Sequence, residues 1–206
     1  MAAGVPSAGA SDAWGCYRAL LERYHRTLDL MSAQGFSDLD EKCTDARAYA
    51  AAVERWAAPG VIMDVGSGAG LPGVALAERL PERPLLWVER RRRRAAFLRL
   101  VAAECAMGNV RVVDRDVRAF PREVLPAALA VVTAQAVAGF ATLYRLTRHL
   151  HDGEVLLVAR RGERWRDEVT AVAEVAAAEV AVLAAEPLGR GGTLVVVSMA
   201  GGPACR

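Results

Sequence analysis

The segment that decides the fold of this chain reads Asp64-Val65-Gly66-Ser67-Gly68-Ala69-Gly70-Leu71-Pro72-Gly73. It follows the short apolar run 61–63 and precedes the apolar, alanine-containing run 74–77. This order predicts a strand, a tight turn and the start of a helix. Glycines at alternate positions let the backbone approach a ligand closely, because no Cβ is in the way. The first turn of the helix points free N–H groups at the same place, so we expect a nucleotide or nucleoside site here.

Three kinds of ligand bind to loops of this type. A phosphate-binding P-loop ends in Gly-Lys-Ser/Thr, whereas this segment continues with Leu71 and Pro72. A dinucleotide fold has the spacing G-x-G-x-x-G, whereas Gly66, Gly68 and Gly70 follow G-x-G-x-G. That spacing after an aspartate resembles motif I of the class I S-adenosylmethionine (SAM) methyltransferases. A turn without a ligand is the remaining interpretation, and it is disfavoured because so many glycines cost conformational entropy.

The composition is typical of a globular protein with one main domain. The chain has 206 residues, of which 53% are hydrophobic, and its formal net charge is +2. These values exclude general disorder, and the charge alone does not indicate a nucleic-acid-binding protein. We recognise neither a signal peptide nor a membrane span. The cysteines form no zinc-ligand or disulfide pattern, so we expect a reducing compartment and a cytoplasmic protein; they are Cys16, Cys43, Cys105 and Cys205.

The order of the apolar segments predicts an α/β protein. Residues 1–12 are predicted to be a flexible N-terminus, residues 13–60 an N-terminal helical cap, and residues 61–206 the SAM-binding methyltransferase domain. Apolar residues spaced by three and four predict the cap helices over 14–31 and 38–58, with a loop between them. The remaining chain alternates strands with helices, which predicts a Rossmann-like, mostly parallel sheet with helices on both faces. Its seven predicted strands are 61–65, 85–88, 110–113, 130–133, 154–158, 180–183 and 194–198.

Acidic residues follow the second and third predicted strands, where ligands of parallel sheets bind. Glu89 lies about 20 residues beyond the glycine segment, as does the acid that accepts both hydroxyls of a ribose in nucleotide-binding folds. Asp116, preferred over Asp114, could accept from an adenine amino group, with a neighbouring backbone N–H donating to the ring. Asp64 is expected to face the ammonium of SAM. The predicted cofactor-binding residues are Asp64, Gly66, Ser67, Gly68, Ala69, Gly70, Leu71, Glu89, Asp116, Val117 and Gln135.

Three segments together resemble one family, the small-subunit ribosomal RNA guanine-N7 methyltransferases (the glucose-inhibited division protein B family). They are the glycine segment with its Leu-Pro-Gly ending, Glu89 with Phe97-Leu98 downstream, and the run 131–138. The front segment 24–30 is also similar to the opening of that family. The resemblance covers most of the chain, and it implies a Rossmann-like class I methyltransferase with SAM as its cofactor.

On the acceptor side, several positions differ from the family pattern. The Arg-His pair of the family is Glu41-Lys42 here, its arginine after the fourth strand is Gln135, and its Leu-Lys-Gly is Arg160-Arg161-Gly162. Since arginine and lysine make most contacts with RNA phosphates, these changes predict a different acceptor. We therefore expect a SAM-dependent methyltransferase acting on a small molecule or peptide in a biosynthetic pathway. The alternatives are 16S ribosomal RNA guanine-N7 methylation and a non-catalytic module that binds SAM or RNA.

The acceptor also decides whether a general base is needed. A ring nitrogen such as guanine N7 takes a methyl group without losing a proton, whereas an ammonium or hydroxyl acceptor must lose one. The acceptor-side candidates are Asp45, Glu41, His25, Gln135 and Arg161. The run Arg90–Arg94 either binds an anionic partner or forms a solvated face. The histidines are scattered without metal-ligand spacing, so no metal site is expected.

Overall fold

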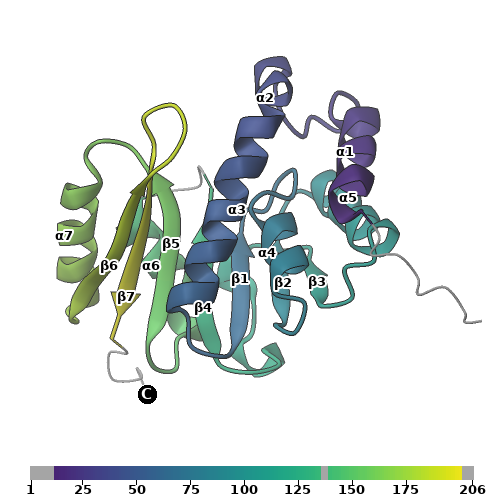
Figure 1. Cartoon of the computed structure of the whole chain (residues 1–206). Helices are drawn as coiled ribbons and strands as arrows, with labels where there is room; N and C mark the ends of the chain where they lie inside the picture. The colour runs from purple at the N-terminus through teal and green to yellow at the C-terminus, as the bar shows by residue number, and fades with distance from the viewer. Residues whose placement is uncertain (1–11, 136–138, 201–206) are drawn as a thin grey trace, which may run out of the picture.

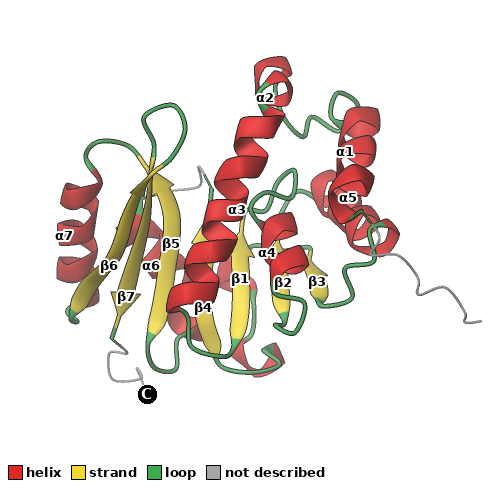
Figure 2. Ribbon diagram, in the orientation of Figure 1, coloured by secondary structure: helices red, strands yellow, loops and turns green. Residues whose placement is uncertain are grey.

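The computed structural model describes residues 12–135 and 139–200, and within them the chain forms one seven-stranded sheet flanked by helices (Figures 1 and 2). The strands are β1 (Val61–Val65), β2 (Leu85–Val88), β3 (Val110–Val113), β4 (Leu129–Ala134), β5 (Val155–Arg161), β6 (Val180–Pro187) and β7 (Thr193–Met199). The α-helices are α1 (Ala13–Tyr24), α2 (Ala33–Ser37), α3 (Leu39–Trp56), α4 (Gly73–Arg79), α5 (Arg92–Glu104), α6 (Phe140–Thr147) and α7 (Trp165–Ala176). Short 3-10 helices cover Val117–Ala119, Arg122–Val124 and Arg148–Leu150.

The sheet has the strand order β3-β2-β1-β4-β5-β7-β6, in which β7 alone runs antiparallel to both of its neighbours. The strands β1 to β5 are parallel, so their carboxyl ends lie on one edge. The chain winds outward in one direction from β1 to β3 and then returns to place β4 on the other side of β1. Ligands of open α/β sheets bind at such a reversal of strand order. The predicted fold and all seven predicted strands are confirmed, although β6 is longer than predicted.

Two layers of core hold the sheet between its helices. Strand residues alternate between the layers: Ile62 packs on the side of α1, α3, α4 and α5, whereas Met63 packs on the side of α6 and α7. Strands buried on both faces carry almost continuous apolar runs, and every residue of β1 is buried. In Figure 1, α3 crosses in front of the strands and α6 lies behind them.

The N-terminal helices pack directly on this core. Two tyrosines with no exposed surface make the connection, Tyr17 from α1 and Tyr49 from α3. The single helix predicted over 14–31 is wrong in its second half, because α1 ends at Tyr24 and Asp29 has a positive φ of 50°. The predicted loop 32–37 contains α2, whose start is capped by the Ser32 side chain accepting from the N–H of Gly35 at 3.0 Å. No helix of residues 12–135 and 139–200 is long and apolar enough to cross a membrane.

The prediction that no disulfide forms is wrong for one pair of cysteines. Cys16 in α1 is bonded to Cys105 at the end of α5, and their Cα atoms lie 5.6 Å apart. The two residues are 89 positions apart in sequence, so only the packing of α1 against α5 brings them together. The pattern of cysteines therefore no longer supports a reducing compartment. Cys43 is a buried free thiol, and Cys205 lies outside the described residues.

Candidate active site

A cavity of about 990 Å³ opens at the carboxyl ends of the parallel strands. The glycine segment and the ends of β2 and β3 form the side that is predicted to bind the cofactor, which we name the cofactor side. The end of β5, the β6–β7 loop and the start of α3 lie on the other side, which we name the acceptor side. The cavity therefore lies at the reversal of strand order, where the topology places a ligand.

The glycine segment has backbone conformations that favour glycine. The φ angles of Gly66, Gly68 and Gly70 are 72°, 55° and 107°. A Cβ on Gly68 would have one protein neighbour, the carbonyl oxygen of Gly66 at 3.6 Å, so its space opens toward the cavity. A Cβ on Gly73 would instead lie 2.4 Å from Nε1 of the buried Trp87. Gly68 thus leaves room for a ligand, whereas Gly73 lets α4 pack on β2.

Asp64 lies beneath the glycine segment rather than on the cavity wall. Its side chain accepts a hydrogen bond from the Thr133 hydroxyl at 2.8 Å, across the paired residues of β1 and β4. Its Oδ2 atom is buried and has no hydrogen-bond partner among the described residues. Burial raises its pKa to about 6, and the hydrogen bonds from Thr133 and Ser67 oppose that rise. An unpartnered buried carboxylate oxygen fits a cationic ligand group such as the ammonium of SAM.

The acids predicted at the ends of β2 and β3 both line the cavity. Glu89 is 5% exposed, and its carboxylate accepts from the backbone N–H groups of Gly68 at 3.2 Å and Arg91 at 2.8 Å. Asp116 accepts from the backbone N–H and the guanidinium of Arg118, which holds its pKa at about 2. Asp114 pairs with Arg99 at 3.4 Å and lies off the cavity wall, so the geometry favours Asp116. Both lining acids are held in place by donors from the chain.

Most predicted cofactor residues gather on one side of the cavity. Nine of the eleven line it, and they are Gly66, Ser67, Gly68, Ala69, Leu71, Glu89, Asp116, Val117 and Gln135. Asp64 and Gly70 lie behind this wall, and a Cβ on Gly70 would contact the side chains of Val74 at 3.2 Å and Tyr17 at 3.4 Å. The open space at Gly68 and the fixed Glu89 carboxylate together fit an adenosyl ligand, whereas contact of Asp64 with the ammonium stays a prediction, because Asp64 does not line the cavity.

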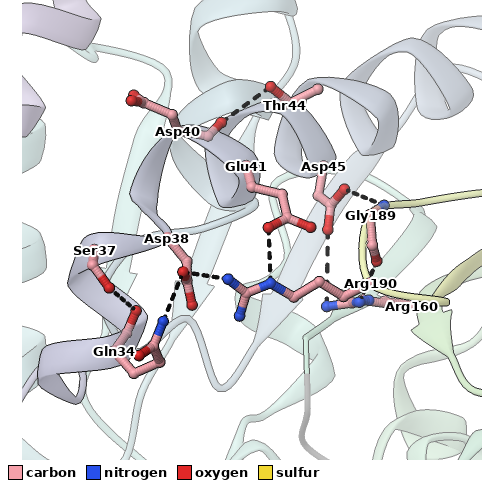
Figure 3. A network of polar contacts seen from close by, with 10 residues as sticks. All are labelled: Gln34, Ser37, Asp38, Asp40, Glu41, Thr44, Asp45, Arg160, Gly189 and Arg190. Carbon is pink, nitrogen blue, oxygen red and sulfur yellow. Dashed lines mark hydrogen bonds and ion pairs between the residues drawn. The ribbon is translucent and has the colours of Figure 1, made fainter.

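Three of the five acceptor-side candidates do not reach the cavity wall. His25 is 5% exposed and stacks on Phe36, with ring centroids 4.0 Å apart. Glu41 accepts from Nε of Arg190 at 2.9 Å, and Asp45 accepts from the backbone N–H of Gly189 at 3.3 Å (Figure 3). These contacts hold both carboxylates against the β6–β7 loop. The expectation that these three side chains offer a general base to an acceptor therefore finds no support in the geometry.

The other two candidates, Gln135 and Arg161, do line the cavity. Arg161 is 8% exposed, and its guanidinium carbon lies 4.6 Å from the centre of the Phe140 ring. Its Nε is 3.4 Å from Glu168, but neither Nε nor Nη2 has a hydrogen-bond partner among the described residues. Burial lowers its pKa, although a guanidinium remains charged at neutral pH. A buried cation with unused donors on the wall indicates an anionic or acceptor-rich ligand.

Four of the five arginines 90–94 contact the turn after α1 or line the cavity. Arg93 and Arg94 donate to the carbonyl oxygens of Thr27 and Asp29, so they fasten the turn after α1 to the start of α5. Arg90, Arg91 and Arg94 line the cavity, and the side chains of Arg90 and Arg91 form no ion pair within the described residues. The run therefore combines contacts within the protein with unpaired charge at the cavity, and an anionic partner for that charge stays a prediction.

Sequence reasoning missed several residues around the cavity. The Tyr17 hydroxyl donates to the carbonyl oxygen of Ala69 at 3.1 Å, and the Tyr49 hydroxyl accepts from the N–H of Arg160 at 2.6 Å. Their apolar spacing in helices marked them as core residues and gave no sign of these hydroxyl contacts. Arg115 and Arg190 also line the cavity, and as single arginines in loops they carry no motif.

Comparisons with known proteins agree with this geometry. Residues 13–190 match the GidB family model, described as rRNA small subunit methyltransferase G. The ribosomal RNA small subunit methyltransferase G of Halorhodospira halophila is 34% identical over 159 residues, 77% of this chain and 72% of the relative. The protein of that name from Methylobacillus flagellatus is 31% identical over 157 residues, 76% of this chain and 74% of the relative.

Solved structures share the fold at low sequence identity. The precorrin-6y C5,15-methyltransferase of Geobacter metallireducens has a TM-score of 0.53 at 16% identity, covering 75% of this chain and 87% of its own. Cofactor-bound Rv0187 from MTB has a TM-score of 0.57 at 13% identity, covering 95% and 93%. From the family match and the identities to its relatives, the chain belongs to the GidB family of class I SAM-dependent methyltransferases.

Proposed function

We propose that this enzyme transfers a methyl group from SAM to a guanine ring nitrogen of small-subunit ribosomal RNA. The observation that carries the proposal is the charge of the cavity, whose lining includes nine basic side chains and two acidic ones. The acids, Glu89 and Asp116, both belong to the predicted cofactor side. The names of the relatives, ribosomal RNA small subunit methyltransferase G, support the same acceptor.

The free cations match the backbone of a nucleic acid. Lys42, Arg90, Arg91 and Arg115 line the cavity, and no ion pair engages them within residues 12–135 and 139–200. Phosphate contacts from lysine and arginine position an RNA and supply much of its affinity. Basic residues of the family are replaced at matched positions of this chain, but arginines at other positions of the cavity wall supply positive charge for the phosphates. A small-molecule or peptide acceptor, which the sequence alone favoured, therefore has less support than RNA.

The lack of a free base on the described wall supports a ring nitrogen as the methylated atom. SAM supplies an activated methyl group on a sulfonium, so the enzyme contributes mainly alignment and the exclusion of water. Glu41 and Asp45 are engaged with the β6–β7 loop, and Glu89 and Asp116 are held by neighbouring donors. An amine or hydroxyl acceptor would need one of them as a base, whereas guanine N7 needs none. A ribosomal acceptor also implies that the enzyme acts in the cytoplasm.

The test is incorporation of labelled methyl groups into small ribosomal subunits purified from cells that lack the guanine-N7 mark. We expect the label to enter the ribosomal RNA. Mild chemical cleavage at N7-methylguanine should then cut the RNA at the methylated position. The same assay with Gly68→Ala serves as the control for contaminating methyltransferases, since this change fills the cofactor space.

Two outcomes would contradict the proposal. Label that enters a small-molecule or peptide fraction but not subunits or deproteinised RNA would support the altered acceptor. SAM binding by calorimetry without turnover on any of these acceptors would support a binding module.

A further inference from the structure

The start of α3 is tied to the β6–β7 loop by a cluster of ion pairs that we name the α3 clasp (Figure 3). It consists of three carboxylates on or just before the first two turns of α3 and two arginines that reach them from the end of β5 and from the loop. Its members are Asp38, Glu41, Asp45, Arg160 and Arg190. These segments lie more than 100 residues apart in the chain, so the clasp forms only in the folded protein.

Arg190 is held by two carboxylates at once. Its guanidinium pairs with Asp38 and with Glu41, and the Nε–Oε2 distance to Glu41 is 2.9 Å. Asp45 accepts from the N–H of Gly189 and lies 3.9 Å from Nη1 of Arg160. Arg160 in turn donates to the carbonyl oxygen of Gly189 at 2.6 Å. The backbone and side chains of the loop are therefore both fixed from α3.

The shape of the loop is adapted to these contacts. A Cβ on Gly189 would lie 2.0 Å from Oε1 of Glu41, and a Cβ on Gly192 would lie 2.2 Å from Nε of Arg160. A side chain at Gly189 would displace the Glu41 carboxylate, and one at Gly192 would displace the Arg160 guanidinium, from their present positions. Glycine at both positions lets the backbone come close to the charged groups.

Asp38 is used for the clasp instead of for the helix. It is the N-cap residue of α3, where an aspartate side chain normally accepts from a backbone N–H and stabilises a helix by about 1 kcal/mol. Here it makes no such capping bond, and its carboxylate binds Arg190 and the Gln34 amide. The arginine holds the pKa of Asp38 below its usual range. Stabilisation of α3 alone does not explain this arrangement.

We propose that Asp38, Glu41 and Asp45 are positioning residues for the methyl acceptor. They act through Arg160, Arg190 and the loop, all of which form the cavity wall away from the ends of β1 to β3. The clasp fixes the position of this wall, and the wall in turn holds the acceptor base in line with the methyl group of the cofactor. The identity of the acceptor rests on the proposed function, but the existence of the clasp does not.

The test is the double variant Asp38→Asn, Glu41→Gln, which removes two negative charges and keeps the size of both side chains. We expect amide hydrogen exchange of residues 188–192 to accelerate. We also expect the KM for unmethylated small subunits to rise about tenfold, which corresponds to about 1.4 kcal/mol, while the Kd for SAM stays unchanged. The matched control is Asp40→Asn, which removes one charge from the same turn of α3, where Asp40 pairs with Arg18 instead.

The sign of the KM change separates positioning from simple charge attraction. Removing carboxylates makes the cavity mouth more positive, so an RNA that only needs cations there would bind more tightly and the KM would fall. A lower or unchanged KM would overturn the proposal, as would exchange of 188–192 at the rate of the wild-type protein. If wild-type enzyme does not methylate subunits, the proposed function fails by itself, and the exchange rates then decide whether the clasp holds the loop.

Arg190 offers a conservative rescue. Arg190→Gln should loosen the loop as the double variant does, and Arg190→Lys should restore part of the KM, since lysine keeps the charge but loses the planar fork. Equal KM values for the two substitutions would argue against a role for the charge in the clasp.

Discussion

The two sides of the cavity are built in different ways. The cofactor side is made of backbone turns and of acids that follow their strands directly, and its parts other than Gln135 lie within about 55 residues of one another between Asp64 and Val117. The acceptor side is made of long charged side chains from α3, β5 and the β6–β7 loop, held by ion pairs between segments more than 100 residues apart. The first is set by local geometry, and the second by charge between distant segments. We therefore expect changes on the cofactor side to alter SAM affinity and changes on the acceptor side to alter the KM for the acceptor.

The largest effect is expected from Gly68→Ala. Its Cβ has open space in the protein, so the methyl group would occupy the room of the ligand, while the positive φ adds roughly 1 kcal/mol of strain. We expect SAM affinity, measured by calorimetry, to fall by about 100-fold or more, roughly 2.7 kcal/mol. The unfolding temperature should fall by only a few degrees.

Gly73→Ala is the matched comparison within the same segment. Its Cβ would collide with the buried Trp87, so the expected loss is in the free energy of unfolding, about 1–3 kcal/mol for an overpacked site. Wild-type SAM affinity in Gly68→Ala with a native circular dichroism spectrum would show that the cofactor lies elsewhere.

Glu89→Ala should have the next largest effect on the cofactor side. The carboxylate is fixed by two backbone N–H groups on the cavity wall and is predicted to accept from the ribose hydroxyls. Loss of charged hydrogen bonds should weaken SAM binding by about 1–3 kcal/mol. Asp114→Ala at the end of the next strand is the control, because Asp114 pairs with Arg99 and should leave the affinity unchanged. Equal SAM affinities for Glu89→Ala and Asp114→Ala would show that Glu89 does not bind the ribose.

The grouping of the predicted cofactor residues around one cavity could be anticipated because its signals are local. The glycine spacing, the strand before it and the acid at the end of β2 each follow from a few neighbouring residues, and nine of eleven predicted residues line one cavity. The two that lie behind the wall, Asp64 and Gly70, belong to the same motif, but the sequence does not tell which motif residues face a ligand. Gly70 and Gly73 also serve packing against Tyr17 and Trp87, which a motif cannot distinguish from ligand binding.

The acceptor side could not be predicted, because its contacts join segments that the sequence separates. Asp45 and Glu41 were sensible candidates for a base as isolated carboxylates near a ligand site. Their partners, Gly189 and Arg190, lie in a loop without a recognisable motif. The disulfide between Cys16 and Cys105 was missed for the same reason. Pairings across such distances depend on how α1 and α3 dock on the sheet.

A pH dependence of SAM affinity would sharpen the role of Asp64. Burial raises the pKa of this carboxyl to about 6 in the free protein, so it becomes neutral below that pH. If its carboxylate attracts the ammonium of SAM, binding releases a proton, and the affinity should fall on acidification below pH 6 by up to about tenfold per pH unit. Calorimetry from pH 5 to pH 8 measures this slope.

Asp64→Asn provides the control for that slope. The amide keeps the acceptor for the Thr133 hydroxyl but cannot ionise, so its affinity should be low and independent of pH. In the wild-type protein without SAM, the free energy of unfolding should depend on pH in the opposite direction to the SAM affinity. The raised pKa of Asp64 contributes stability that is present below pH 3.8 and lost as the pH rises through about 6. If the SAM affinity of the wild-type protein did not change between pH 5 and pH 8, Asp64 would not bind the ammonium of SAM.

The smallest expected effects come from two buried tyrosine hydroxyls, and they test the comparison most directly. Tyr17→Phe removes the donor to the carbonyl oxygen of Ala69, in the glycine segment. Tyr49→Phe removes the acceptor for the N–H of Arg160, next to the α3 clasp, and also the donor to the carbonyl oxygen of Ala134 at 3.3 Å. Tyr17→Phe should cost about 1 kcal/mol in the free energy of unfolding, the usual contribution of one hydrogen bond, and Tyr49→Phe about twice that.

Their kinetic effects should differ in kind as well. Tyr17→Phe should raise the Kd for SAM by a few-fold, because it loosens the turn that faces the cofactor. Tyr49→Phe should leave that Kd unchanged and raise the KM for the acceptor, because Arg160 and the loop it holds lose a fixed backbone. If both variants changed the Kd for SAM and the KM for the acceptor in parallel, the two sides of the cavity would respond as one unit. The contrast between local turns and distant ion pairs would then describe how the two walls are built, but not how each contributes to binding.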